Sequence, residues 1–294
     1  MSHELIDQVR NDYKQILLDP QNSIITGSTD SATMSSSVGY TPEELALVPA
    51  EANLGLGCGN PLRAANLQSG EVVIDLGSGA GLDAFLAGVQ VGRRGKAVGV
   101  DMTPEMVSTA RRIAKENRIR NVEFRLGEIE NLPAADNFAD VCISNCVINM
   151  SLNKGRVYRE IYRVLKPGGR IFVNFPPYFH PTGAHMSDVI GIPWVHMFFP
   201  EKTLIQAYKD LVRGLPDEQD RLSLRFSTDA SGREYISYLN KMTIRKFHSI
   251  VKRMNLKLYW YQELPLRPYF ALFARIPVLK EMFVKMCACV IEKQ

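Results

Sequence analysis

The sequence contains few cysteines and no long uncharged apolar run, and both features limit the class of protein to which it can belong. Its five cysteines are odd in number and scattered over 294 residues, which argues against a disulfide scaffold and favours a reducing cytoplasm. No run of about 18 residues is both apolar and uncharged, so no segment is predicted to span a membrane. Residues 1–20 carry acidic side chains and lack a cleavage site, which predicts an amphipathic helix rather than a secretory signal.

The chain also lacks an excess of charge of one sign. Its formal net charge is +4, and the charged 22% of residues mix both signs. No nucleic-acid partner is predicted, because proteins that bind nucleic acids gather basic side chains on one surface. The spacing of His180, His185 and His196 matches no metal-ligand signature, so no resident metal is predicted. These histidines lie beyond the last central strand, where one of them could act as a general base toward an organic substrate.

Strands and helices alternate between residues 71 and 175. The predicted strands are Val72–Leu76, Ala97–Val100, Val122–Leu126, Asp140–Ser144 and Arg170–Asn174. The predicted helices are Leu82–Val91, one capped by Thr103 with Pro104 in its first turn, and Arg156–Leu165, which Pro167-Gly168-Gly169 should end. Strands separated by such helices pair in parallel through right-handed crossovers. The fold class is therefore α/β, with a doubly wound, mostly parallel sheet.

The flanks of this region have a different character. Residues 20–41 are rich in Ser, Thr and Gly and are predicted to form a mobile loop that could act as a lid. Residues 264–280 are apolar with interspersed basic residues; they predict a buried cap helix, or else a segment that closes over a lipophilic substrate or lies on a membrane surface. The chain is expected to have three parts: an N-terminal helix and lid or substrate loop (1–69), a ligand-binding core (70–176), and a largely helical substrate cap with the closing strands Leu256–Gln262 and Met286–Ile291 (177–294).

A glycine-rich segment directly after the first strand is the most informative motif. Asp75-Leu76 is followed by Gly77-Ser78-Gly79-Ala80-Gly81, with glycines at alternate positions. The dinucleotide fingerprint G-x-G-x-x-G places its third glycine one residue later. The earlier glycine favours a nucleoside without pyrophosphate over a nicotinamide cofactor. The carboxylate of Asp75 would repel phosphate and would suit an ammonium or sulfonium group.

Polar residues follow the next strands at the same edge of the sheet. Asp101 ends the second strand, where a carboxylate can accept hydrogen bonds from both ribose hydroxyls. Glu128 and Ile129 follow the third strand, where an acceptor and an apolar surface could meet an adenine. Asn145 follows the fourth strand, whose end should face the reacting group of the ligand.

These motifs together resemble those of class I S-adenosylmethionine (SAM)-dependent methyltransferases. The segments that carry the resemblance are Asp75–Gly81, Gly99–Met102, Gly127–Ile129 and Leu165–Gly169. The resemblance implies a seven-stranded Rossmann-like sheet and SAM as the cofactor of the core. It also implies a methionine end of SAM at the glycine loop, a ribose at Asp101 and an adenine near Met102 and Ile129.

A narrower resemblance, over residues 40–175, is to arsenite methyltransferases. It rests on Tyr40–Leu45, Asn53–Pro61, Gly99–Met106 and Ser144–Asn149. In that family cysteine thiolates hold trivalent arsenic beside SAM, and the arsenic lone pair attacks the methyl group. Cys58 and Cys146 match two of the three functional cysteines, so the resemblance implies that they are catalytic As(III) ligands. A soft metalloid prefers thiolates, as soft metals do.

The third cysteine of that family has no counterpart in this sequence. The corresponding region, residues 187–197, contains no cysteine, and a missing donor leaves several acceptors open. Glutathione or another thiol could complete an arsenic site, as could Cys287 or Cys289, whereas Cys142 is predicted to be a core residue. The alternatives are C-, O- or N-methylation of a small, lipophilic organic acceptor and a non-catalytic SAM or arsenic binder.

Overall fold

The computed structural model describes Lys14 and residues 30–294, apart from residues 58, 146, 149, 150, 152, 184, 185, 187, 230, 238–240 and 278. The chain divides into two compact units. Unit 1 comprises Met1–Phe172 and Val290–Gln294, and unit 2 comprises Val173–Cys289. Apart from Lys14, the amphipathic helix predicted for residues 1–20 lies outside the described residues.

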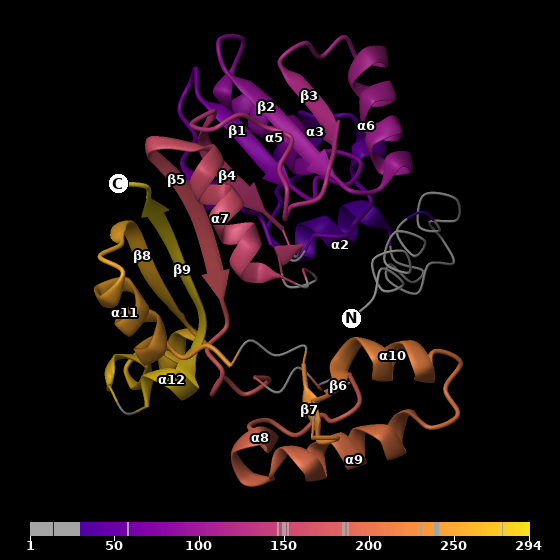
Figure 1. The fold of residues 1–294 in the computed structure, drawn as a ribbon, viewed down its shortest axis with the longest axis vertical. Coiled ribbons are helices and arrows are strands. Elements are labelled where there is room, and N and C mark those ends of the chain that lie inside the picture. The colour runs from indigo at the N-terminus through magenta and orange to yellow at the C-terminus, as the bar shows by residue number, and fades with distance from the viewer. Residues whose placement is uncertain are drawn as a thin grey trace. The chain divides into compact units, whose positions relative to one another are not determined.

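The strands form a seven-stranded sheet in the order β3-β2-β1-β4-β5-β9-β8 (Figure 1). Its members are β1 (Val72–Leu76), β2 (Lys96–Asp101), β3 (Val122–Leu126), β4 (Ala139–Ser144), β5 (Leu165–Phe175), β8 (Lys257–Pro265) and β9 (Val284–Glu292). The pairs β1–β2, β2–β3, β1–β4 and β4–β5 are parallel. The predicted doubly wound, mostly parallel sheet is confirmed.

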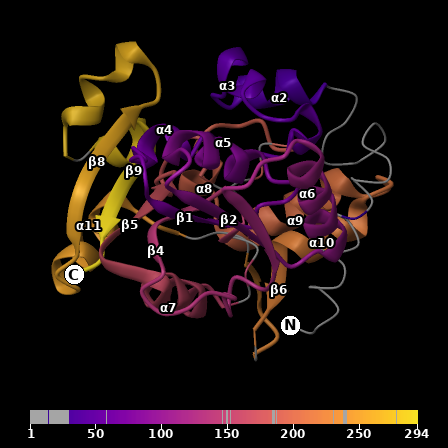
Figure 2. The same cartoon turned by 90° about the horizontal axis from the view of Figure 1, so that it is seen from above.

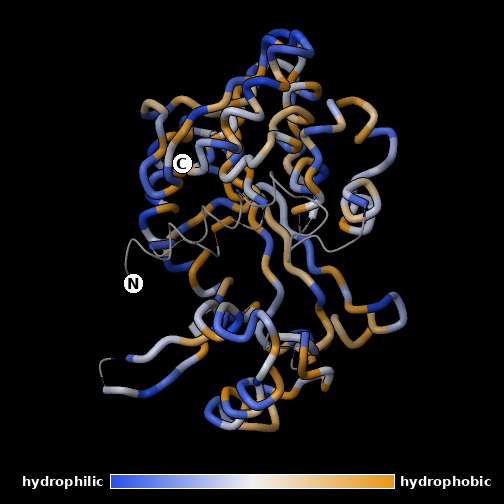
Figure 3. The backbone as a smooth tube through the Cα atoms, turned by 90° about the vertical axis from the view of Figure 1, so that its right-hand side faces the viewer, coloured by the Kyte–Doolittle hydropathy of each residue, from blue (hydrophilic) through white to orange (hydrophobic). Residues whose placement is uncertain are grey.

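Helices cover both faces of the sheet of unit 1. Helix α5 (Leu82–Val91) and helix α7 (Lys154–Val164) lie on opposite sides of strands β1 and β4 in Figure 2. Successive strand residues point to opposite faces, so Val73 packs in the core with α5 and with α6 (Pro104–Glu116), while Ile74 points to the other face. Strands that are buried on both faces are mostly apolar, and Figure 3 colours the backbone by the hydropathy of each residue.

Three local predictions are wrong. Strand β5 begins at Leu165 instead of Arg170, because Pro167-Gly168-Gly169 is part of the strand, beside a register shift against β4. Residues 30–41 are not all loop: helix α2 (Ser31–Ser37) begins at Asp30, whose carboxylate accepts hydrogen bonds from the first-turn amides, and α3 (Pro42–Ala46) follows. Thr103 precedes α6, but its side chain makes no cap hydrogen bond.

Apart from the strands that it contributes to the seven-stranded sheet, unit 2 is mainly helical. Its helices are α8 (Val195–Phe198), α9 (Glu201–Val212), α10 (Glu218–Arg225), α11 (Ile244–Arg253) and α12 (Lys280–Phe283), and a short hairpin joins β6 (Phe226–Thr228) to β7 (Glu234–Ile236). The buried Tyr208 of α9 packs edge-on against Phe226 in one of its clusters. Residues 264–280 do not form the predicted buried helix, since Tyr269 and Leu272 are exposed. No helix among the described residues is long and apolar enough to cross a membrane.

Candidate cofactor site

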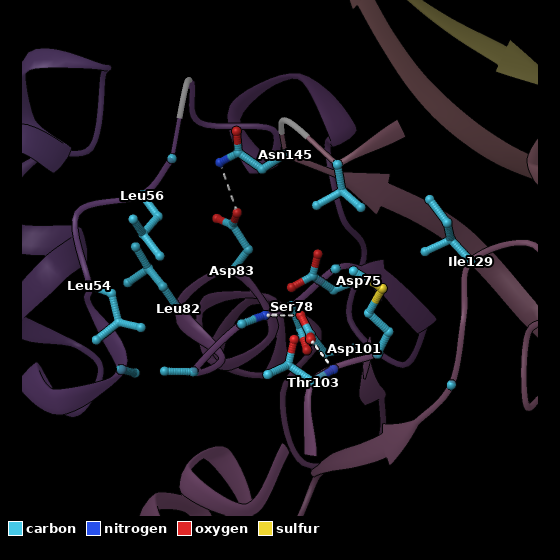
Figure 4. A pocket seen from close by; sticks show the side chains of 18 of the residues that line it. Leu54, Leu56, Asp75, Ser78, Leu82, Asp83, Asp101, Thr103, Ile129 and Asn145 are labelled. Atoms are coloured by element: carbon cyan, nitrogen blue, oxygen red, sulfur yellow. Dashed lines mark hydrogen bonds between the residues drawn. The ribbon is translucent and has the colours of Figure 1, made fainter. Parts of the chain in front are cut away.

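A pocket lies in unit 1 at the carboxyl ends of β1, β2 and β4. Parallel sheets bind ligands at this edge, where the strand order reverses. Figure 4 shows three carboxylates in the pocket, from Asp75, Asp83 and Asp101, with leucine side chains on one side and Ile129 on the other. The lining residues include Tyr40, Leu54, Leu56, Gly57, Gly77, Ser78, Gly79, Leu82, Met102, Thr103, Glu128, Glu130, Asn145, Val147 and Ser151.

The glycine loop shapes the floor of this pocket. Its first amides, those of Gly77 and Ser78, donate to the Val100 carbonyl at 2.7 and 3.1 Å, which ties the loop to β2. Gly77 has a φ of +71°, and a Cβ there would lie 2.2 Å from a methyl carbon of Val147. Gly79 also has a positive φ, yet a Cβ there would meet no atom within 4 Å. The loop therefore leaves open space beside the backbone that a ligand can approach.

Asp75 is a buried carboxylate with unused hydrogen-bonding capacity. Its side chain is 2% exposed, and Oδ2 has no hydrogen-bond partner among the described residues. Burial raises the pKa of Asp75 well above its usual value, and the negative charges of Asp83 and Asp101 raise it further. An unpaired buried acceptor is costly, and a cationic ligand would both pair with Oδ2 and stabilise the ionised carboxylate.

Asp101 joins the second strand to the glycine loop. One carboxylate oxygen accepts the Gly79 amide at 2.9 Å and the other accepts the Thr103 amide at 2.8 Å. Burial raises the pKa of Asp101, and these amides partly offset the effect. Because an ionised carboxylate has about four lone-pair positions, it can still accept from a hydroxyl donor of a ligand beside these amides and the Thr103 side chain.

Asp83 lies at the centre of a hydrogen-bonded network in the wall of the pocket. The Tyr40 hydroxyl donates to Asp83 Oδ1 at 2.6 Å, and the Asn145 amide donates to Oδ2 at 3.1 Å. The same Asn145 amide group lies 2.7 Å from the Gly59 carbonyl. A Cβ at Gly57 would lie 2.9 Å from that amide nitrogen, so a glycine is needed for the close approach. The network connects α5, the loop after β4 and the loop around residue 58.

The structure brings most of the predicted cofactor residues together. Asp75, Gly77, Ser78, Gly79, Asp101, Met102, Glu128, Ile129 and Asn145 line the pocket. Gly81 does not line it: a Cβ at this position would lie 2.6 Å from the Phe124 ring, so the residue serves helix packing. Cys58 and Cys146 lie outside the described residues.

Several pocket residues were not predicted from the sequence. Asp83 and Tyr40 are the most important, because both are buried and joined by a hydrogen bond. A signal for Asp83 does exist: it is the single charged residue in a mostly apolar helix, Leu82–Val91. Tyr40 precedes the capping box of α3, formed by Thr41 and Glu44, which fixes where the chain enters that helix.

Comparison with known proteins identifies the fold's family. A family model described as a methyltransferase domain matches residues 67–191. The ubiquinone/menaquinone biosynthesis C-methyltransferase of Hydrogenovibrio crunogenus is 34% identical over 179 residues, which cover 59% of this chain and 70% of that protein. The chain belongs to the class I SAM-dependent methyltransferases.

Arsenite methyltransferases are also similar to part of this methyltransferase. The protein of Halobacterium salinarum is 53% identical over 143 residues, covering 49% of this chain and 37% of that protein. The chain thus spans less than half of the length of that relative, and 49% of the arsenite methyltransferase of Aquipseudomonas alcaligenes, at 39% identity. A solved arsenic(III) SAM methyltransferase from Chlamydomonas reinhardtii gives a TM-score of 0.45 at 22% identity, over 90% of this chain and 73% of that one.

The cofactor of this methyltransferase family is SAM, and the pocket residues fit it. The unpaired Oδ2 of buried Asp75 suits the ammonium of the methionine end. The remaining acceptor capacity of Asp101 suits a ribose hydroxyl. Met102 and the buried Ile129 offer apolar contact for a purine ring, and no metal-binding cluster of His, Cys, Asp and Glu occurs among the described residues.

Proposed function

We propose that this chain methylates thiol-bound trivalent arsenic, with Cys58 and Cys146 as two arsenic ligands. The observation that supports this most is the 2.7 Å hydrogen bond from the Asn145 amide to the Gly59 carbonyl. Gly59 directly follows Cys58, and Asn145 directly precedes Cys146. This bond therefore joins the two cysteine-bearing segments beside the cofactor pocket. The arsenite methyltransferase of Halobacterium salinarum, at 53% identity over 143 residues, supports the same acceptor.

The proposed chemistry uses the lone pair of arsenic. Bound SAM supplies an electrophilic methyl group on its sulfonium. Two thiolates hold the soft As(III) through As–S bonds and place its lone pair in line with that methyl. An As–C bond forms while the methyl–sulfur bond breaks, and the electron pair of the broken bond stays on sulfur. The positive charge moves from the sulfonium to arsenic in this step, while Asp75 still faces the ammonium, which the transfer leaves unchanged.

The third arsenic ligand is proposed to be an external thiol such as glutathione. Cys142, Cys287 and Cys289 are buried and none lines the pocket. Burial raises the pKa of Cys287 and of Cys289 to about 12, and it raises the pKa of Cys142 as well. Since the thiolate is the metalloid ligand, these three thiols are poor donors near neutral pH.

The second candidate function is methylation of a small organic acceptor. The C-methyltransferase of Hydrogenovibrio crunogenus favours it, because this chain matches 70% of that protein but only 37% of the haloarchaeal arsenite methyltransferase. The lack of a third cysteine in residues 187–197 favours it as well. In this case the thiols of Cys58 and Cys146 would not be required for turnover.

The two candidates are separated by one incubation and three variants. Purified protein is mixed with SAM, As(III) and glutathione, and methylarsenicals are measured by mass spectrometry. Cys58→Ser and Cys146→Ser should abolish methylarsenical formation while calorimetry shows SAM affinity near that of the wild type. The control Cys289→Ala removes a buried thiol that has no role in the proposal and should keep turnover. Normal SAM binding without any methylarsenical would overturn the proposal, and an untargeted search for metabolites that gain a methyl group would then test the organic acceptor.

A further inference from the structure

The turns between β8 and α12 in unit 2 present large apolar side chains to solvent. Two 3-10 turns, η3 (Pro268–Phe270) and η4 (Phe273–Arg275), form most of this connection. Tyr269 is 72% exposed and Leu272 is 70% exposed; Phe273 and Ile276 are about 40% exposed. Exposed apolar side chains gathered within eight sequence positions (269–276) mark an interaction surface more often than isolated ones do.

The inner side of these turns is anchored in an aromatic cluster. The Phe270 ring lies 4.9 Å from the Phe283 ring, and the Phe273 ring lies 5.3 Å from it, between centroids. Ala274 is buried, and the Leu266 amide donates to the Phe283 carbonyl at 2.8 Å. The backbone that carries Tyr269 and Leu272 is therefore held in place, and these side chains cannot all turn inward without breaking the cluster.

The charges beside this surface have one sign. Arg267 and Arg275 are exposed on it, and residues 264–280 contain no Asp or Glu. Neither arginine has an ion-pair partner among the residues that the structure describes. The flanking carboxylates are engaged elsewhere: Glu263 pairs with Lys280 at 2.8 Å, and Glu281 accepts the first amides of α11 at 2.9 Å.

We propose that Arg267–Ile276 docks unit 2 on an anionic lipid bilayer. Tyr269, Leu272 and Ile276 would enter the headgroup region, where amphipathic aromatic and aliphatic side chains are favoured. Arg267 and Arg275 would meet lipid phosphates, which a surface free of carboxylates attracts. The combination of apolar and basic side chains supplies the two signals that stable membrane attachment needs.

The test is co-sedimentation of the full chain with vesicles of phosphatidylcholine alone or with phosphatidylglycerol. Binding is expected only with the anionic lipid. Each arginine is expected to contribute about fivefold to the partition coefficient, so the double variant Arg267→Gln/Arg275→Gln should lower it at least tenfold. The double variant Tyr269→Ser/Leu272→Ser should lower it by a similar factor. Phe198→Ser is the matched control: Phe198 is also 72% exposed, but it lies near Glu201 on another element of unit 2.

The outcomes separate a lipid surface from other partners. Circular dichroism and the thermal midpoint check that the double variants fold. Equal binding to both vesicle types, unchanged binding in the double variants, or an equal loss in Phe198→Ser would overturn the proposal. A dimer that disappears in Tyr269→Ser/Leu272→Ser, without vesicle binding by the wild type, would assign the surface to self-association instead. Binding of SAM is measured in parallel and should be unchanged in every variant.

Discussion

The buried carboxylate of Asp83 gives a quantitative test of the site's electrostatics. Burial raises its pKa from 3.8 to about 6, and hydrogen bonds from Tyr40 and Asn145 offset only part of that effect. A raised pKa means that the folded chain binds this proton more tightly than the unfolded chain does. Stability from this group is therefore fully present below pH 3.8 and is lost as the pH rises through about 6.

The size of the effect follows from the two pKa values. The shift corresponds to about 3 kcal/mol in total, of which about half is lost between roughly pH 5 and pH 7.5. For a chain of this size that loss lowers the thermal midpoint by about 2–6 °C. Asp83→Asn keeps the volume and removes the charge, and it also removes one of the charges that raise the pKa of Asp75.

The assay is thermal or denaturant unfolding of the unliganded protein at both pH values. Both the wild type and Asp83→Asn are measured at about pH 5 and about pH 7.5, and the loss of stability between these pH values is compared. The loss should be larger in the wild type by the contribution worked out above for Asp83. Asp210→Asn, on the exposed face of α9 where Asp210 pairs with Arg213, is the control and should keep the wild-type difference. If Asp83→Asn shows the same pH dependence as the wild type, the burial argument for this carboxylate is refuted.

Three further predictions concern ligand binding and turnover. Gly77→Ala should weaken SAM binding about tenfold or more in calorimetry, because its Cβ would collide with Val147, whereas Gly191→Ala, whose Cβ meets open space, should leave affinity unchanged. Tyr40→Phe removes the hydrogen bond to Asp83 and should lower the free energy of unfolding by about 1–3 kcal/mol. It should also reduce the turnover rate more than the affinity for SAM. Equal losses of turnover and affinity would contradict a role of Tyr40 in positioning the loops around residues 58 and 146. SAM binding should release protons, because a cation favours the ionised form of Asp75, whose pKa is raised by burial and by the neighbouring carboxylates. Affinity should therefore rise as the pH rises above the ordinary range of a carboxyl group, and calorimetric enthalpies that do not depend on the buffer's ionisation enthalpy would argue against it.

Local sequence signals predicted the elements of unit 1 correctly where the hydrophobic pattern and the residues that end an element agree. The bounds of β1, α5 and β3 coincide with the predicted ranges, because the apolar residues of β1 and α5 and the alternating ones of β3 each end directly before a glycine. At β5 the signals conflict, since Pro167-Gly168-Gly169 normally interrupts structure. Pairing with β4 on either side of it, at Leu165 and Arg170, and a hydrogen bond from the Gly168 amide to the Lys293 carbonyl keep that segment in the sheet. Such partners are remote in sequence, so no local window contains them.

The site shows the same division between local and tertiary information. Asp75, Asp101 and the glycine loop are recognisable because each lies at or directly after the carboxyl end of an apolar strand. Asp83 depends on tertiary structure instead, since its role comes from the Tyr40 hydroxyl and the Asn145 amide, which lie 43 and 62 positions away. Its burial, which raises its pKa, and the two donors that partly offset this rise follow from how three segments pack.

The hydrogen bonds of Lys293 affect the order in which the protein can be assembled. The Lys293 ammonium donates to the Tyr162 and Leu165 carbonyls at 2.7 and 2.6 Å, and its backbone bonds Gly168 and Gly169. These residues all belong to unit 1, yet the whole of unit 2 lies between them in the chain. During translation the cofactor-binding unit must therefore wait for unit 2 to be synthesised before the edge of its sheet is closed. A fragment ending at residue 172 would expose that edge to pairing with other chains.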